Sequence, residues 1–279
     1  MGPIPTPDTI LNIVEYKQGK PLVYFVYIAS MNIQNSFEVV FPTSLQITEQ
    51  VVDVSFLNEK QRQFYINLLE EIIALYENNN NQRMIIGFAG VSGSGKSVVV
   101  ELLSNLASQV NLPFAVTTVG IDAYSFTNDY LLTHEDDGVA LKEYKGRYDT
   151  YDVEKLVRDL SAFSSGENIS LPLYSRRIHD PVENVTVIST QQNLLLVEGL
   201  WLLYEENGWD EVRERLDYCY FIDSKKEDAR DLTIKRHIQG GRSKEDATVY
   251  YDSVDATNYE LVSETKEKAD AIIPSFLSI

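Results

Sequence analysis

The stretch Met84-Ile-Ile-Gly-Phe-Ala-Gly-Val-Ser-Gly-Ser-Gly-Lys-Ser-Val98 decides the fold of this 279-residue chain. Residues 84–89 form an apolar run typical of a buried strand, and residues 98–103 have the pattern of a helix. Between them, Gly90-x-x-x-x-Gly95-Lys96-Ser97 has the spacing of a phosphate-binding loop. Glycines let successive backbone N–H groups turn toward one anion at the amino end of the following helix. A chance glycine-rich turn, the alternative, would not explain the strand and helix on the correct sides.

This spacing predicts a nucleotide site. Lys96 can reach the β- and γ-phosphates, and the Ser97 hydroxyl can ligate Mg²⁺. We therefore expect ATP and Mg²⁺ as cofactors. The chain has no Asn-Lys-x-Asp motif of the kind that usually reads guanine, and the preference between ATP and other nucleoside triphosphates stays open. The positions expected to hold the nucleotide are Gly90, Ser92, Gly93, Ser94, Gly95, Lys96, Ser97 and Val98.

The charge balance restricts the partners of this protein. The net charge is −18, from 24 Lys and Arg against 42 Asp and Glu, which argues against nucleic acid and membrane partners. A site for phosphates must therefore gather cations locally, so Lys and Arg beside motifs carry weight. The single cysteine, Cys219, excludes an internal disulfide framework. No signal peptide or membrane-spanning run is apparent, and we expect a cytoplasmic protein.

A polar tract at 77–82 predicts a boundary between an N-terminal appendage (1–80) and the main domain (81–279). Two aromatic and β-branched runs followed by a helical pattern predict a β-hairpin and an amphipathic helix upstream: 22–28, 36–41 and 58–77. No catalytic signature occurs there. We expect a packing appendage, with a regulatory or dimerisation module as the alternative.

Downstream, strand-like and helical patterns alternate. The apolar runs are 84–89, 114–119, 193–197, 218–222 and 269–273, and the helical patterns are 96–108, 153–163, 209–216 and 225–238. This alternation predicts an α/β fold with a mostly parallel five-stranded sheet covered by helices on both faces. Ligands of such sheets bind beyond the carboxyl ends of the strands.

Two acids follow predicted strands at that edge. Asp122 is placed to orient the hydroxyl of a phosphoryl acceptor and to take its proton, although a turn or helix-cap role would explain it equally. Glu198 ends the fully apolar run 194–197, which favours a role in holding Mg²⁺ through water or in polarising the acceptor. The alternative for Glu198 is an acid that faces solvent.

Two further stretches concentrate cations. The segment 172–180 carries Tyr174, Arg176, Arg177 and His179. Adjacent arginines suit a carboxylate or phosphate on the acceptor, because guanidinium binds such groups bidentately, unless one of them faces solvent.

The second cationic stretch is 234–242, where Arg236 and Arg242 flank Gly240-Gly241. An arginine-bearing lid around 236–250 would neutralise transition-state charge and exclude water. Cations that complement a helix carboxyl end are the alternative.

In this order, over roughly 84–273, these stretches resemble the P-loop kinase superfamily of uridine kinase, phosphoribulokinase and bacterial-type pantothenate kinase. They are most similar to its poorly characterised nucleoside- or fructose-kinase-like branch. Five segments carry the resemblance: Asp122-Ala123-Tyr124, Tyr174-x-x-x-x-His179, Lys145-Gly-Arg-Tyr-Asp-Thr-Tyr-Asp152, Glu198-Gly-Leu-Trp-Leu-Leu203 with Trp209, and Arg236-His237 followed by Gly241. Three positions depart from the family pattern and lie near the expected acceptor: Ala123, Tyr148 and Leu200.

The resemblance implies an ATP-dependent kinase acting on a hydroxyl of a small metabolite, with nucleoside, pantothenate-like and sugar acceptors all open. It implies catalytic roles for Lys96, Asp122, Arg236 and Arg242, and a metal site at Ser97 and Glu198. The acceptor contacts that it implies are Asp122, Tyr124, Lys145, Tyr174, Arg176 and His179. A regulatory or assembly P-loop ATPase without such an acceptor is the alternative, and a homodimer is left open.

Overall fold

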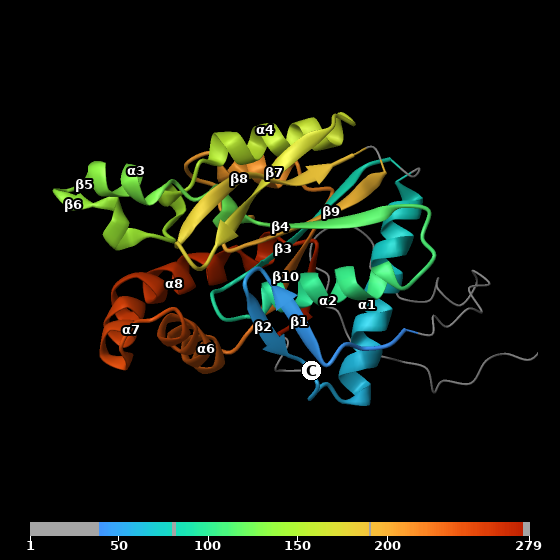
Figure 1. The fold of residues 1–279 in the computed structure, drawn as a ribbon, viewed down its shortest axis with the longest axis horizontal. Helices are drawn as coiled ribbons and strands as arrows, with labels where there is room; N and C mark the ends of the chain where they lie inside the picture. Colours follow the sequence, from blue (N-terminus) through green and yellow to red (C-terminus); the bar gives the residue numbers. More distant parts are fainter. Residues whose placement is uncertain (1–38, 80–81, 190, 276–279) are drawn as a thin grey trace, which may run out of the picture.

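The computed structural model describes residues 39–79, 82–189 and 191–275. Its centre is a five-stranded sheet in the order β11-β10-β3-β9-β4, and every pairing in it is parallel (Figure 1). The strands are β3 (Met84–Gly90), β4 (Ala115–Gly120), β9 (Gln192–Gly199), β10 (Tyr218–Asp223) and β11 (Ala271–Pro274). The predicted α/β fold with a five-stranded parallel sheet is therefore confirmed.

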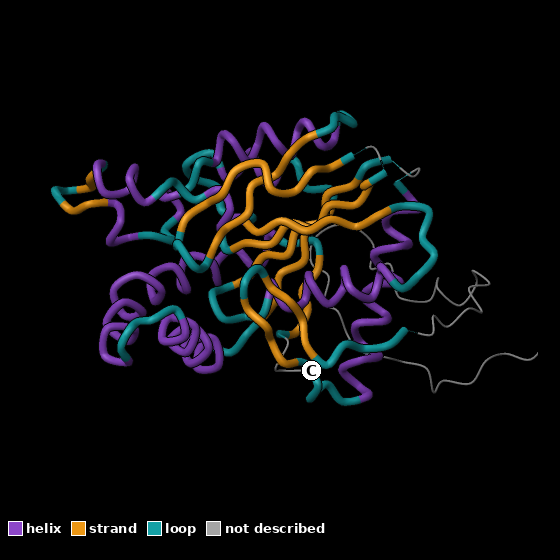
Figure 2. Tube along the Cα trace, viewed as in Figure 1, coloured by secondary structure: helices purple, strands orange, loops and turns teal. Residues whose placement is uncertain are grey.

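Helices cover both faces of this sheet, as Figures 1 and 2 show. Successive side chains of β3 enter opposite cores, because side chains alternate across a strand: Ile86 and Phe88 pack into one cluster, and Ile85 and Ala89 into the other. Burial on both faces explains why the strand is a continuous apolar run. The covering helices are α1 (Glu59–Asn78) and α2 (Lys96–Ser108) on the first face, and α4 (Val153–Ser164) and α5 (Trp209–Glu214) on the second.

The N-terminal region contains the predicted helix but a different hairpin. Helix α1 begins at an Asn58 capping box and packs into the same core as α2, and the proposed boundary near residue 80 falls between α1 and β3. The hairpin expected at 22–28 and 36–41 lies outside the described residues, except for 39–41, which form no strand. The structure instead has a short hairpin of β1 (Ser44–Ile47) and β2 (Gln50–Asp53) that lies against α2.

A second hairpin was not predicted. Strands β7 (Ile169–Ser175) and β8 (Asp180–Ile188) pair antiparallel in the region that the sequence suggested to be a loop. Pro172 and a register shift next to it break the regular alternation on which a strand prediction depends. The segment 172–180 is thus the end of one strand, a four-residue turn and the start of the next.

The remaining elements surround the carboxyl edge of the sheet. They are α3 (Asn128–Thr133), β5 (Glu135–Asp136), β6 (Val139–Ala140), α6 (Lys226–Gln239), α7 (Lys244–Tyr250) and α8 (Ala256–Glu264). Figure 1 shows α6, α7 and α8 gathered on one side of the molecule. Within the described ranges, no helix is long and apolar enough to cross a membrane.

Candidate active site

The glycine loop between β3 and α2 has the backbone that a phosphate-binding loop requires. Gly93 and Gly95 have φ of 77° and 92°, the left-handed region that suits glycine. A Cβ at position 93 would lie 2.3 Å from the carbonyl oxygen of Ala229 in α6. Glycine is therefore needed there both for its backbone angle and for the close approach of α6.

Polar groups of the loop are buried and ready for an anion. Lys96, the first residue of α2, donates a 2.8 Å hydrogen bond to the carbonyl of Val91, and burial lowers its pKa to about 8. The Ser94 hydroxyl is buried without a hydrogen-bond partner among the described residues. A buried polar group costs free energy unless it is paired, so these atoms fit a site that a nucleotide phosphate completes. The side chain of Val98 packs against the core.

Ser97 and Glu198 meet where α2 begins and β9 ends. The Ser97 hydroxyl donates a 2.7 Å hydrogen bond to Oε1 of Glu198. Burial raises the pKa of Glu198, and the nearby Lys96 ammonium opposes this shift. Both residues line a cavity of about 80 Å³. Mg²⁺ takes hard oxygen ligands, often one or two from protein, so this donor set fits the ion.

Asp122 lies in a 3-10 turn (Ile121–Tyr124) directly after β4. Its Oδ1 accepts a 3.3 Å hydrogen bond from the hydroxyl of the buried Tyr151, whose pKa is raised well above the usual range by burial. Asp122 lines the small cavity and also a larger one of about 690 Å³. Its carboxylate therefore stands where the Ser97–Glu198 pair and the large cavity meet.

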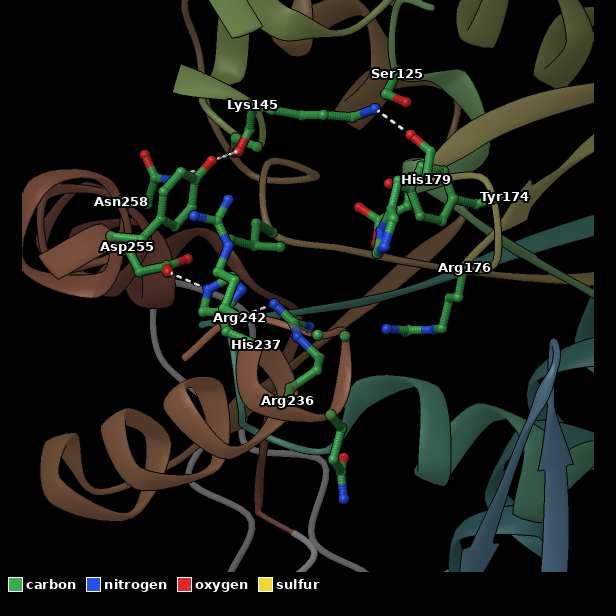
Figure 3. Close-up of a pocket in the computed structure, with 18 of the residues that line it drawn as sticks. Ser125, Lys145, Tyr174, Arg176, His179, Arg236, His237, Arg242, Asp255 and Asn258 are labelled. Atoms are coloured by element: carbon green, nitrogen blue, oxygen red, sulfur yellow. Dashed lines mark hydrogen bonds and ion pairs between the residues drawn. The ribbon is translucent and has the colours of Figure 1, made fainter. Parts of the chain in front are cut away.

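The large cavity is strongly cationic (Figure 3). Its lining contains six Lys and Arg but two carboxylates among the described residues, and one of these, Asp255, accepts a 2.7 Å contact from His237. The six cations are Lys142, Lys145, Arg176, Arg177, Arg236 and Arg242.

Lys145 and Lys142 are held together by one amide. Lys145 Nζ donates to Oδ1 of Asn128 at 2.9 Å and to the carbonyl of His179 at 2.7 Å, and Lys142 Nζ donates to the same Asn128 oxygen. Asp180 forms an ion pair with Lys145 at 3.8 Å. Burial, and secondarily the neighbouring Lys142, lowers the pKa of Lys145 to about 8.

The predicted lid segment contacts two sides of the cavity. Arg236 donates a 2.8 Å hydrogen bond to the Ser92 hydroxyl of the glycine loop. The Arg242 guanidinium lies 3.9 Å from the Tyr250 ring centroid, and the Tyr250 hydroxyl donates to the carbonyl of Lys145 at 2.7 Å. Helices α6 and α7 thus join the glycine loop to the Lys145 segment.

Tyr174, Arg176 and His179 lie on the β7–β8 hairpin, and all three line the large cavity. The Arg176 Nε is buried without a hydrogen-bond partner among the described residues. In Figure 3, Arg176 extends into the same space as Arg236 and Arg242 from the opposite side.

Tyr124 requires a correction. Its side chain is buried, its hydroxyl donates a 3.0 Å hydrogen bond to Asp159, and it lines neither cavity. A 3-10 turn has three residues per turn, so residues two apart, such as Asp122 and Tyr124, point in different directions. The Tyr124 side chain therefore lies outside both cavities, where its contact with the acceptor was expected.

Two of the three departures from the family pattern line a cavity. Leu200 lines the large cavity and Ala123 the small one, whereas Tyr148 packs edge-on against Trp201 at 5.7 Å. Ala123 is also buried in the core, whereas Leu200 is partly buried and packs against it.

Several lining residues were missed by sequence reasoning: Gln50, Ser125, Lys142, His237, Tyr250 and Asn258. The sequence did carry a signal for Lys142. It precedes Lys145 by three residues, which is the repeat of a 3-10 helix, and such a helix spans Leu141–Tyr144. No sequence signal pointed to Gln50. It lines the cavity only because the β1–β2 hairpin brings it close to residues that are distant in the sequence.

A parallel sheet with a glycine loop between β3 and α2, and with a serine–carboxylate pair at the adjoining strand end, defines a P-loop protein. The chain belongs to the Phosphoribulokinase / Uridine kinase family, whose model matches residues 85–278. The resemblance drawn from the motifs is thereby confirmed, and the family is one of kinases.

Individual relatives agree with this assignment. The uncharacterized protein YggC of Escherichia coli K12 is 30% identical over 223 residues, which cover 80% of this chain and 90% of that protein. A uridine kinase of Macrococcus caseolyticus is 30% identical over 68% of this chain and 87% of its own. A pantothenate kinase of Lactococcus lactis is 29% identical, but the match spans 45% of its length.

Among solved structures, a putative fructose transport system kinase from Silicibacter sp. TM1040 superposes with a TM-score of 0.66 at 22% identity. The superposition covers 75% of this chain and 98% of that one. At this identity the likeness concerns the fold.

Proposed function

We propose that this protein is an ATP- and Mg²⁺-dependent kinase that phosphorylates a hydroxyl of a small metabolite bearing a carboxylate or phosphate. One observation carries the proposal: the Asp122 carboxylate stands between the Ser97–Glu198 pair and a cavity lined by six cations. Phosphoryl transfer needs little from a protein beyond positioning and charge stabilisation, and both are available in this arrangement.

The residues divide into three roles. Lys96 and the glycine-loop amides would hold the triphosphate, while Ser97 and Glu198 would hold Mg²⁺, which neutralises phosphate charge when bound. Arg236 and Arg242, from the lid side, would stabilise charge on the transferring phosphoryl group. Both arginines line the large cavity, and the hydrogen bond from Arg236 to Ser92 of the glycine loop supports this division.

Asp122 would act on the acceptor. Its carboxylate would orient the acceptor hydroxyl and take its proton as the new O–P bond forms and the bond between the β-phosphate oxygen and the γ-phosphorus breaks. The Tyr151 hydroxyl donates to one oxygen of Asp122, which favours a fixed orientation and leaves the other oxygen for the acceptor.

The cavity supports an anionic acceptor. After Arg236 and Arg242 are assigned to the phosphoryl group, Lys142, Lys145 and Arg176 still line the cavity. The two lysines share one amide oxygen, and the buried Nε of Arg176 has no hydrogen-bond partner in the part of the chain that the structure describes. In a chain of net charge −18, such a local excess of cations favours a carboxylate or phosphate on the substrate.

The test is ADP production with Mg·ATP against matched pairs of acceptors. Each pair joins an anionic compound to a neutral counterpart: sugar phosphates with sugars, hydroxy acids with their methyl esters, and pantothenate with its alcohol. Uridine and cytidine complete the panel, and Lys96→Ala is the blank. We expect acceptor-dependent ADP that vanishes in the blank and that favours the anionic member.

Two results would count against the proposal. Equal turnover of the charged and neutral members of each pair would contradict the proposal of an anionic acceptor but would still support kinase activity. ATP binding or slow hydrolysis without dependence on any acceptor would instead favour the regulatory ATPase.

A further inference from the structure

The turn between β1 and β2 is joined by hydrogen bonds to the turn between β7 and β8. The Glu49 carboxylate accepts a 2.9 Å hydrogen bond from the Ser175 hydroxyl at Oε1 and a 2.7 Å hydrogen bond from the Arg177 backbone N–H at Oε2. Both donors are more than a hundred positions away in the chain, at separations of 126 and 128 residues. The match to the family begins at residue 85, so Glu49 lies upstream of the family domain.

The conformation of the β1–β2 turn is itself unusual. Ile47 pairs with Gln50, which leaves Thr48 and Glu49 as a two-residue turn, and Thr48 has φ of 52°. A β-branched residue seldom adopts this left-handed region, and such strain persists where the surroundings impose it. Here the buried side chains of Leu45 and Ile47 fix the hairpin in the core under α2.

The turn that Glu49 holds is the one that presents the acceptor-side cations. Arg176 lies between the two donors, Ser175 and Arg177, and lines both cavities. From the other side, Lys145 holds the same turn through the carbonyl of His179 at 2.7 Å. Gln50, the next residue after Glu49, lines the large cavity with Arg176.

The bonding also favours the charged form of the Glu49 carboxyl. The hydrogen bond from Ser175, and next the one from the Arg177 backbone, lower the pKa of the Glu49 carboxyl. A charged acceptor makes the stronger hydrogen bond, so the contact is suited to holding an exposed turn in one conformation.

We propose that the β1–β2 turn is part of the acceptor site, with Glu49 as the residue that positions Arg176 and Gln50 as a residue that contacts the acceptor. This inference rests on the proposed kinase function. By this inference, the β1–β2 hairpin, which precedes the family domain, contributes to substrate selectivity.

The first experiment uses the free protein without any ligand. Hydrogen–deuterium exchange of peptides covering 173–180 is compared among wild type, Glu49→Ala and the control Glu77→Ala, which removes an exposed carboxylate of α1 without touching this turn. An amide that loses its hydrogen bond exchanges more readily through local opening. We therefore expect the peptides that contain the Arg177 amide to exchange about tenfold faster in Glu49→Ala and at an unchanged rate in Glu77→Ala. Unchanged exchange would overturn the anchoring role of Glu49.

The second experiment measures kinetics with the acceptor that the panel identifies. We expect Glu49→Ala and Gln50→Ala to raise KM for the acceptor about tenfold, with KM for ATP unchanged and partial rescue by Glu49→Asp. An unchanged acceptor KM would overturn the role in the acceptor site, even with faster exchange. If the panel yields no acceptor, the proposed function fails and the role of Gln50 fails with it, while the exchange result still decides the role of Glu49.

Discussion

The Ser97 hydroxyl and Oε1 of Glu198 are 2.7 Å apart, although the two residues are separated by 101 positions in the chain. Strands β3 and β9 are parallel neighbours, so the start of α2 and the end of β9 meet at the same edge of the sheet. This meeting brings a hydroxyl and a carboxylate together beside the glycine loop, where a metal ion bound to nucleotide phosphates would lie.

Glu198→Gln tests the metal site. The amide keeps the shape of the side chain but loses the charge, so we expect the Mg²⁺ concentration for half-maximal activity to rise on the order of 100-fold. The control is Glu101→Gln, because Glu101 lines the same small cavity but accepts a hydrogen bond from Thr118. Equal Mg²⁺ dependence of the two variants would contradict the assignment.

Gly120→Ala tests the same site by steric means. A Cβ at position 120 would lie 2.9 Å from Oε1 of Glu198, and the end of that side chain can move aside. We expect the Mg²⁺ concentration for half-maximal activity to rise, with a melting temperature within about 5 °C of wild type, since a clash with a flexible group costs little. A large drop in melting temperature without an effect on Mg²⁺ would show that the residue serves the fold instead.

Asp122→Asn tests the base. General-base catalysis typically contributes 10²–10⁴-fold, so we expect a loss of transfer on that order with the ATP dissociation constant changed by less than about twofold. Asp210→Asn, an exposed acid on α5, is the control. Near wild-type transfer by Asp122→Asn would remove the base assignment.

The lowered pKa of Lys96 predicts that ATP binding depends on pH. Burial lowers its pKa to about 8, so in the free protein the ammonium loses its proton as the pH rises through 8, whereas bound phosphates would favour the charged form. ATP affinity should therefore fall above pH 8, and binding should take up protons there. Calorimetric titrations in buffers of different ionisation enthalpy would measure both. Lys96→Arg, which stays charged, should flatten the profile, and a flat wild-type profile would contradict the prediction.

The same pKa shift has a consequence for stability. Below pH 8 Lys96 is protonated in both the folded and the unfolded chain, and burial of its charge lowers the free energy of unfolding. Between pH 8 and about 10.5 the unfolded chain binds more protons than the folded one, so this residue's contribution to the free energy of unfolding rises with pH.

Trp209→Phe tests the packing behind Asp122. The buried Trp209 indole donates a 2.9 Å hydrogen bond to the carbonyl of Tyr148 and packs edge-on against Tyr151 at 5.6 Å. Losing ring volume and leaving that carbonyl unpaired should lower the free energy of unfolding in urea by about 2 kcal/mol. Tyr204→Phe, which removes a hydroxyl bonded to Glu206 near the surface, should cost less than about 0.5 kcal/mol. Equal losses would contradict the account.

The β3 strand, the glycine loop and α2 could be predicted from the sequence because their determinants are local. A continuous apolar run fills both cores, glycines allow the left-handed backbone angles, and the helix follows without a break. The positions of Asp122 and Glu198 followed from the same logic, since each ends a parallel strand and such ends share one edge of the sheet.

The acceptor side depended on contacts that no local pattern encodes. Tyr124 shares a motif with Asp122, yet the tight turn directs it into the core toward Asp159. Glu49 and Gln50 come from a segment with no recognisable motif. Because the β1–β2 hairpin packs on α2 beside the β7–β8 turn, Glu49 reaches Ser175 and Arg177 and Gln50 lines the large cavity. The glycine loop was readable from the sequence because one continuous stretch builds it, whereas the proposed acceptor side is assembled from distant segments whose meeting depends on side-chain packing across the whole fold.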